Sequence, residues 1–169
     1  MKRFPFYFLL VGLLFVSASY AQEVESSSYG RMLEKRLPKN VPIIDVDDVD
    51  IEDNSIVFLD AREICEYEVS HIENARFIGY KKADLEDVLS LPKETEIIVY
   101  CSIGYRSGKI SKDLIDEGFT NVHNLYGGIF EWSNQEMPLV DNNGKSTTKV
   151  HPYSKKWGKW ITSGEKAYH

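Results

Sequence analysis

Cysteine is scarce in this chain: only Cys65 and Cys101 occur among its 169 residues. A small secreted domain that relies on disulfides carries more cysteines, because each bridge consumes a pair. Two cysteines form at most one bridge, so a hydrophobic core has to hold the fold. A cysteine without an obvious structural partner is a candidate for chemistry, and we single out Cys101 on this ground.

The chain also lacks an apolar run of the roughly 20 residues that a membrane-spanning helix needs. The apolar stretch from Phe4 to Val16 is shorter and contains Pro5 and Gly12. It follows Lys2 and Arg3, so its basic start and apolar middle match the first two parts of a secretory signal peptide.

The third part of that pattern is a cleavage site after small residues. Ser19 and Ala21 fit it and predict cleavage between Ala21 and Gln22, while no cysteine stands there to carry a lipid. We therefore expect residues 1–21 to be removed and the protein to be periplasmic or secreted, without stable membrane insertion. An uncleaved membrane anchor is the alternative.

Positive charge is in the minority, with 20 Lys and Arg against 26 Asp and Glu and a net charge of −6. Affinity for nucleic acid depends largely on Lys and Arg at phosphates, so we expect no nucleic-acid partner. Acidic residues gather between positions 45 and 53. They lack the glycine and the spaced terminal glutamate of a calcium loop, which favours a solvated turn over a metal site.

The chain contains no internal repeat, and the residues after position 21 suffice for one compact domain but not two. Short unbroken apolar runs predict strands buried on both faces, as in a parallel sheet. They are Ile43-Ile44, Ile56 to Leu59 and Ile97 to Tyr100, and Val122 to Leu125 is a further candidate strand.

Segments with helical periodicity lie between these runs. They contain Leu85, Val88 and Leu89; Ile110 and Leu114, with Gly118 as the stop; and a short helix from Gly127-Gly128 through Trp132. A further short helix is expected near Tyr29 to Leu37. Alternating strands and helices predict an α/β fold, whose ligands bind outside the carboxyl ends of the parallel strands. Asp60 and Cys101 stand at two such ends.

The segment from Val99 to Gly108 reads as strand, tight loop and helix. Gly104 permits a turn, and Ser107 can cap or begin the helix. A Cys101 thiolate would then face backbone N–H groups and the positive helix end, and Arg106 would add a cation if it turns inward. The helix dipole alone, at about 0.3–1 kcal/mol, lowers a thiol pKa too little, so hydrogen bonds of about 1.5–3 kcal/mol are needed as well. A buried structural cysteine is the alternative.

The loop C-x-x-G-x-R-S resembles the active-site loop of the rhodanese family, and of its small periplasmic members in particular. Two further stretches resemble family signatures in the same order. Phe58 to Ala75 resembles D-x-R-x-x-x-E-Y followed by G-H-I-x-G-A, and Gly118 to Trp132 resembles G-F-x-N-V, L-x-G-G and W. Ser70 and Asn74 replace the usual glycines, at turns away from the cysteine.

The resemblance implies a three-layer fold whose central, mainly parallel five-stranded sheet carries helices on both faces. It divides the chain into an N-terminal segment (residues 22–41), a rhodanese-like domain (42–139) and a basic aromatic tail (140–169). The tail either packs its aromatic side chains back on the acidic domain, which we favour, or forms a patch for an anionic partner.

By the same resemblance, Cys101 takes a sulfur atom from a donor such as thiosulfate, holds it as a persulfide and passes it to a thiol or cyanide. The resemblance implies no metal or organic cofactor and identifies no protein partner. The backbone N–H groups that would cradle the persulfide belong to Ser102, Ile103, Gly104, Tyr105, Arg106 and Ser107. A non-enzymatic persulfide carrier or docking module of the same fold is the alternative function.

Loop length separates this chemistry from that of related phosphatases and arsenate reductases, which use C-x5-R. Here Arg106 is the fifth residue after Cys101, giving C-x4-R and a smaller cradle that suits one sulfur atom.

Four other positions are candidates for a role. Asp60 and Arg62 either orient the loop or meet the substrate, or they form an ion pair that holds the loop. His71 is expected to be structural. Cys65 is expected to pack towards the sheet, with a resolving thiol for Cys101 as the alternative.

Overall fold

The computed structural model describes residues 28–168. Residues 28–36 form a helix, as expected near Tyr29 to Leu37, and belong to a first compact unit that ends at Arg36. The second unit begins at Leu37 and contains the sheet, the predicted cysteine loop and the C-terminal segment. The predicted signal peptide, residues 1–21, lies outside the described residues.

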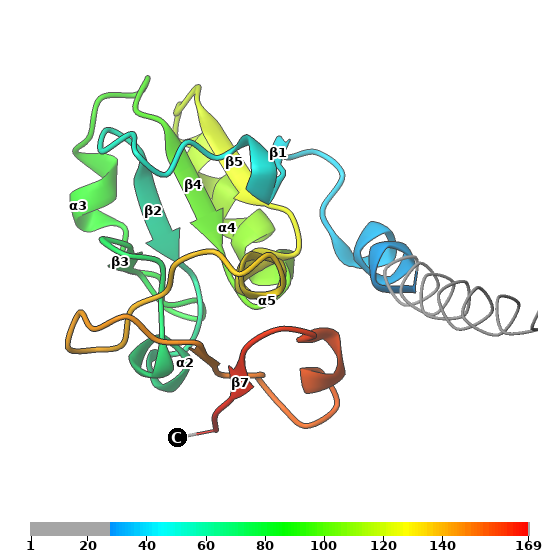
Figure 1. Ribbon diagram of the computed structural model, residues 1–169. Helices are drawn as coiled ribbons and strands as arrows, with labels where there is room; N and C mark the ends of the chain where they lie inside the picture. The colour runs from blue at the N-terminus through cyan, green and yellow to red at the C-terminus, as the bar shows by residue number, and fades with distance from the viewer. Residues whose placement is uncertain (1–27, 169) are drawn as a thin grey trace, which may run out of the picture. The chain divides into compact units, whose positions relative to one another are not determined.

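Five parallel strands form the central sheet in the order β1-β5-β4-β2-β3 (Figure 1). Their bounds are β1 Ile43–Ile44, β2 Val57–Asp60, β3 Arg76–Phe77, β4 Ile97–Tyr100 and β5 Val122–Leu125. The three apolar runs and the further candidate strand Val122 to Leu125 account for four of these strands. The fifth, β3, escaped prediction because it is a two-residue edge strand whose side chains are exposed, which leaves no apolar run to detect.

Helices cover both faces of the sheet, which confirms the predicted α/β fold. They are α2 Ile64–Val69, α3 Glu86–Leu89, α4 Tyr105–Asp116 and α5 Gly128–Asn134, with short 3-10 helices at Val46–Asp48 (η1) and Gly158–Trp160 (η2). One face packs against α3 and α4 through a shared core that includes Val99, Val88 and Leu114. On the other face Phe58 of β2 meets Trp132 of α5, with ring centroids 6.0 Å apart.

The C-terminal segment folds back on the domain, as the sequence analysis favoured, but its aromatic residues Tyr153 and Tyr168 remain exposed. β6 (Lys149–Val150) pairs in parallel with β7 (Glu165–Lys166), and β6 contacts both α2 and α5. Asn134 at the end of α5 donates a hydrogen bond to the carbonyl of Trp160 at 2.9 Å. Val150 and Ile161 are buried.

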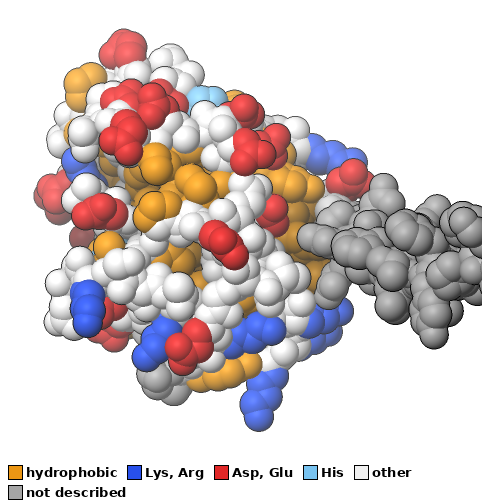
Figure 2. Space-filling model, viewed as in Figure 1, with side chains coloured by type: hydrophobic (Ala, Val, Ile, Leu, Met, Phe, Trp, Pro, Cys, Tyr) orange, Lys and Arg blue, Asp and Glu red, His pale blue; other side chains and the backbone are white. Residues whose placement is uncertain are grey.

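Charge is unevenly distributed over the surface. In Figure 2 acidic side chains are most numerous at one end of the molecule, and lysines and arginines gather towards the end where the C-terminal segment lies in Figure 1. Within residues 28–168 no helix is both long and apolar enough to cross a membrane.

Candidate functional site around Cys101

Cys101 stands immediately after β4, at the carboxyl end of the sheet, and is 1% exposed. The chain then turns through Gly104, with φ of 95°, into α4. A Cβ at Gly104 would lie 2.7 Å from Leu37 Cδ2 and 3.2 Å from the Leu125 carbonyl oxygen, so the turn needs glycine for both conformation and space.

The first turn of α5 fixes the same loop from a second side. The N–H groups of Ile129 and Phe130 donate to the carbonyl oxygens of Cys101 and Ser102 at 2.9 and 3.2 Å. This close approach requires Gly128, where a Cβ would lie 2.3 Å from the Cys101 carbonyl oxygen. Two helices therefore meet at the loop, and the second glycine of Gly127-Gly128 makes the contact possible.

The sulfur of Cys101 lies in a setting that favours the thiolate. The Gly104 N–H donates to Sγ at 3.2 Å. Burial opposes ionisation, but the Arg106 cation, the N–H and hydroxyl of Ser107 and the N–H of Ile103 outweigh it and lower the pKa of Cys101 below that of an ordinary thiol. The loop can thus present a nucleophile inside an almost closed cradle.

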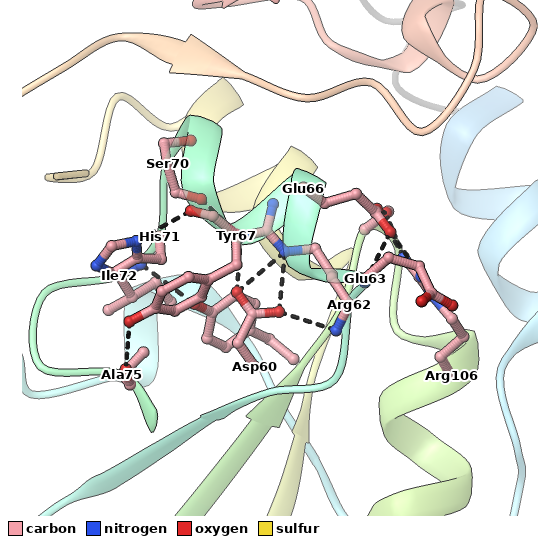
Figure 3. Close-up of polar contacts among 12 residues, drawn as sticks. Asp60, Arg62, Glu63, Glu66, Tyr67, Ser70, His71, Ile72, Ala75 and Arg106 are labelled. Atoms are coloured by element: carbon pink, nitrogen blue, oxygen red, sulfur yellow. Dashed lines mark hydrogen bonds and ion pairs between the residues drawn. The ribbon is translucent and has the colours of Figure 1, made fainter. Parts of the chain in front are cut away.

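Arg106 turns inward, as the predicted role for it required, and is held by Glu66 of α2 (Figure 3). Its Nη1 and Nη2 donate to the two carboxylate oxygens of Glu66 at 2.7 and 2.8 Å, and Nη2 also donates to Ser102 Oγ at 2.9 Å. The Ser102 hydroxyl in turn donates to Glu66 at 2.8 Å. Burial opposes the charge of Glu66, yet these contacts with Arg106 lower the pKa of its carboxyl group.

Ser107 does not cap α4, contrary to the sequence expectation, because the helix already begins at Tyr105 behind Gly104. Its hydroxyl donates instead to Asn124 Oδ1 of β5 at 2.7 Å, and Asn124 Nδ2 donates to the Gly104 carbonyl at 2.9 Å. The hydroxyl has one proton, so donation to Asn124 and donation to the Cys101 sulfur are alternatives. Asn124 thus ties the loop to the neighbouring strand.

The Asp60 and Arg62 side chains form a fully buried ion pair that does not reach the surface. Arg62 Nε lies 2.9 and 3.0 Å from the two Asp60 oxygens, and Nη2 lies 2.6 Å from both Asp60 and the Ser70 carbonyl oxygen. The pair therefore holds the connection after α2 (Figure 3). Of the predicted roles, the ion pair is the one observed, although the segment that it holds is the connection after α2.

His71 is structural, as expected. Its ring stacks on Tyr67 at 3.8 Å between centroids, and Nδ1 lies 3.1 Å from the Tyr67 carbonyl oxygen. Nearby Asn74 adopts φ of 61°, so it takes the left-handed conformation that a glycine would supply.

The expectation that Cys65 packs towards the sheet is wrong. Cys65 is exposed on α2, and both cysteines are free. The short helix turns Glu66 inward to meet Arg106, which leaves the preceding residue facing solvent.

Among the predicted cradle residues, Ser102, Ile103, Gly104 and Ser107 are buried, Arg106 is partly buried, and Tyr105 is 42% exposed. Three residues that the sequence analysis gave no role complete the site: Glu66, Asn124 and Tyr153. Glu66 belongs to the quoted D-x-R-x-x-x-E-Y motif and so carried a signal, and Asn124 is a polar side chain in the predicted strand Val122 to Leu125. Tyr153 belongs to the tail, and its ring lies 5.2 Å from Cζ of Arg106.

Within residues 28–168 no cluster of three or more His, Cys, Asp or Glu side chains could hold a metal ion. The groups around Cys101 are backbone N–H donors, one hydroxyl and one cation, which together suit an anionic sulfur species.

Comparison with known proteins identifies relatives of part of the chain. Over 98 residues the chain is 36% identical to the tRNA uridine(34) hydroxylase of Yersinia pestis (strain Pestoides F), which covers 53% of the chain and 28% of that protein. The chain thus spans little more than a quarter of the length of the curated relatives it matches.

Solved structures show the same fold. The rhodanese-like domain of an Anabaena sp. protein has a TM-score of 0.53 at 25% identity, covering 59% of this chain and 79% of that one. The thiosulfate sulfurtransferase of Pseudomonas aeruginosa has a TM-score of 0.56 at 22% identity, covering 82% and 26%.

The model of the rhodanese-like domain family matches residues 48–135, which is just over half of the chain and contains β2 to α5 with the Cys101 loop. The chain belongs to the rhodanese-like domain family.

Proposed function

We propose that this protein is a sulfurtransferase that carries a sulfane sulfur as a persulfide on Cys101. The arrangement around Cys101 is the observation that carries the proposal. A buried thiol with a lowered pKa lies beside the Gly104 N–H, at 3.2 Å, and close to the Arg106 cation. Such a site can form a nucleophilic thiolate and can hold the anionic persulfide that results.

With thiosulfate as donor, the Cys101 thiolate attacks the outer sulfur atom and forms a new S–S bond. The original S–S bond of thiosulfate breaks, and sulfite leaves with its electron pair. Cyanide or a thiolate then attacks the outer sulfur of the persulfide, and Cys101 departs as the thiolate. Each half balances in atoms and charge and needs no external oxidant or reductant.

The short loop between Cys101 and Arg106 and the existing contacts of Arg106 both favour a single sulfur atom over a tetrahedral oxyanion. The Arg106 guanidinium already donates to both oxygens of Glu66 and to Ser102. It therefore acts on the thiolate mainly by charge, and its forked donors are occupied before any anion arrives.

We do not extend the tRNA chemistry of the hydroxylase relatives to this chain. Its net charge of −6 gives no general attraction for RNA phosphates, and the match spans only 28% of the relative. On the signal pattern at the N-terminus, we propose that the enzyme works in the periplasm or outside the cell on a small donor and a thiol or cyanide acceptor.

A thiosulfate:cyanide assay tests the function. The purified protein should form thiocyanate, and its mass after thiosulfate treatment should rise by one sulfur atom, about 32 Da. Cys101→Ser should abolish both results while the fold survives.

Cys65→Ser is the matched control, because Cys65 is exposed and free. It should retain turnover and the added sulfur. Equal thiocyanate formation by the Cys101→Ser variant and the unaltered protein would refute the mechanism. Added sulfur without turnover would instead favour a persulfide carrier.

A further inference from the structure

The C-terminal segment contacts the residues around Cys101 through Tyr153. Tyr153 lies with its ring 5.2 Å from Cζ of Arg106, the same guanidinium whose edge is held by Glu66. The Arg106 side chain is only 11% exposed. In Figure 1 this segment crosses the end of the sheet towards which β2 and β4 point, and β6 contacts α2 and α5.

The backbone holds Tyr153 in an uncommon conformation. Its φ is 61°, which costs a non-glycine residue about 1–2 kcal/mol and persists only where the surroundings impose it. Two contacts impose it here. The Tyr153 N–H donates to Nδ1 of the buried His151 at 3.1 Å, and the Ser154 N–H donates to the Pro152 carbonyl at 2.6 Å.

The ring itself is not a core side chain. Tyr153 is 53% exposed, so one side of it meets Arg106 and much of the remainder faces solvent. Cys101, in contrast, is 1% exposed. Arg106 lies close enough for its charge to act on this sulfur, and its guanidinium contacts the Tyr153 ring.

We infer that Tyr153 is a specificity-determining residue that narrows the approach to Cys101 and favours small sulfur donors and acceptors over bulky ones. The choice of substrate class rests on the proposed sulfurtransferase function, whereas the restriction of access does not. A rigid aromatic ring suits this role because it has few rotamers to lose, and its contact with the Arg106 cation stabilises its position.

Alkylation of the thiol measures access without any need for turnover. The experiment uses protein carrying Cys65→Ser, so that Cys101 is the one thiol that reacts. Second-order rates are measured with iodoacetamide and with the bulky N-(1-pyrenyl)maleimide. Tyr153→Ala should accelerate the bulky reagent about tenfold more than the small one, a barrier difference of about 1.4 kcal/mol.

Three variants make the test specific. Tyr153→Gly removes the ring and also suits the positive φ, so it should fold as well as the parent and show the same selective acceleration. Tyr153→Phe keeps the ring and should behave as the parent. Tyr168→Ala removes another exposed aromatic side chain of the segment, one whose ring meets His151, and should leave the ratio of the two rates unchanged.

A second arm compares kcat/KM for thiosulfate with kcat/KM for an aromatic thiosulfonate. Tyr153→Ala should improve the aromatic donor relative to thiosulfate. Equal acceleration of both alkylating reagents, or none, in Tyr153→Ala and Tyr153→Gly would overturn the inference. A protein without turnover would overturn the proposed function and leave the alkylation result standing.

Discussion

At the scale of single residues, Arg106 has two negatively charged partners, the Glu66 carboxylate and the Cys101 thiolate. It neutralises the buried carboxylate of Glu66 at 2.7 and 2.8 Å, and its charge also favours the Cys101 thiolate. The pKa of Arg106 is raised because these contacts outweigh the effect of burial. Its cation is therefore permanent across the working pH range, and the protonation state of the thiol is what varies.

Replacement of Arg106 by alanine should make the thiol harder to ionise. It removes the favourable cation and leaves the Glu66 carboxylate unpaired nearby, and both changes raise the pKa of Cys101. Alkylation by iodoacetamide should slow about tenfold or more at neutral pH, the equivalent of losing one charge-assisted contact.

The midpoint of the rate against pH should move to higher pH in that variant. Arg106→Lys keeps the positive charge but not the forked donors of the guanidinium. Its midpoint should lie between those of the parent and Arg106→Ala. The measurement is made with Cys65→Ser as background, since Cys65 is exposed. An unchanged profile in Arg106→Ala would show that the cation does not act on the sulfur.

At the scale of elements, the site is a junction of β4, α4 and α5. The first turn of α5 hydrogen-bonds the carbonyl groups of Cys101 and Ser102, so the N–H groups of the loop remain directed at the sulfur. The contact depends on Gly128, which has no side chain where the Cys101 carbonyl passes.

Gly128→Ala should therefore displace the loop. Its φ is 57°, and the new Cβ would lie 2.3 Å from the Cys101 carbonyl oxygen, which accepts the hydrogen bond of Ile129. We expect the free energy of unfolding to fall by about 2 kcal/mol or more, and most of the sulfur transfer to be lost. Urea unfolding and the thiocyanate assay measure the two effects.

Gly118→Ala is the matched control for this variant. Gly118 also has a positive φ, of 92°, but nothing lies within 4 Å of a Cβ there. It should lose only the conformational term, about 1–2 kcal/mol, and keep its activity. Similar losses of activity in both variants would show that the close contact at Gly128 is not what matters.

At the scale of the whole molecule, Glu66 joins α2 to the loop and to α4, so its charge contributes to global stability. Its side chain is 2% exposed, and the pKa of its carboxyl is lowered despite burial because Arg106 donates to both oxygens. A group with a lowered folded-state pKa stabilises the protein above its unfolded-state pKa. That contribution is lost as pH falls through the folded-state value.

The free energy of unfolding should consequently begin to fall below about pH 4.5, the ordinary value for this carboxyl group. Glu66→Gln should lower stability by about 1.5–3 kcal/mol at pH 7 and flatten the acid dependence. Glu68→Gln, at an exposed position on the same helix, is the control and should keep the parent profile. Denaturant unfolding at a series of pH values gives the comparison, and an equally steep acid limb in Glu66→Gln would contradict the assignment.

The local patterns of the sequence were sufficient for four of the five strands and for the position of Cys101 at the end of β4. The run from Ile97 to Tyr100 is a strand because all its side chains are buried, and Cys101 follows it into a glycine turn. Burial on both faces shows as an unbroken apolar run, and a tight turn shows as a glycine. Both can be recognised from a few neighbouring residues, without knowledge of the segments that pack against them.

Contacts between distant segments could not be recognised in this way. Cys65 faces solvent because its neighbour Glu66 is directed at Arg106, 40 positions along the chain. Ser107 bonds Asn124 on another strand instead of capping its own helix.

Tyr153 reaches the site because the C-terminal segment folds back against α2 and α5. The sequence alone determined four of the five strands and the place of Cys101 at the end of β4, since these depend on neighbouring residues. Tertiary structure decided which side chains surround that thiol, since burial, ion pairing and aromatic contact join residues that the chain keeps far apart.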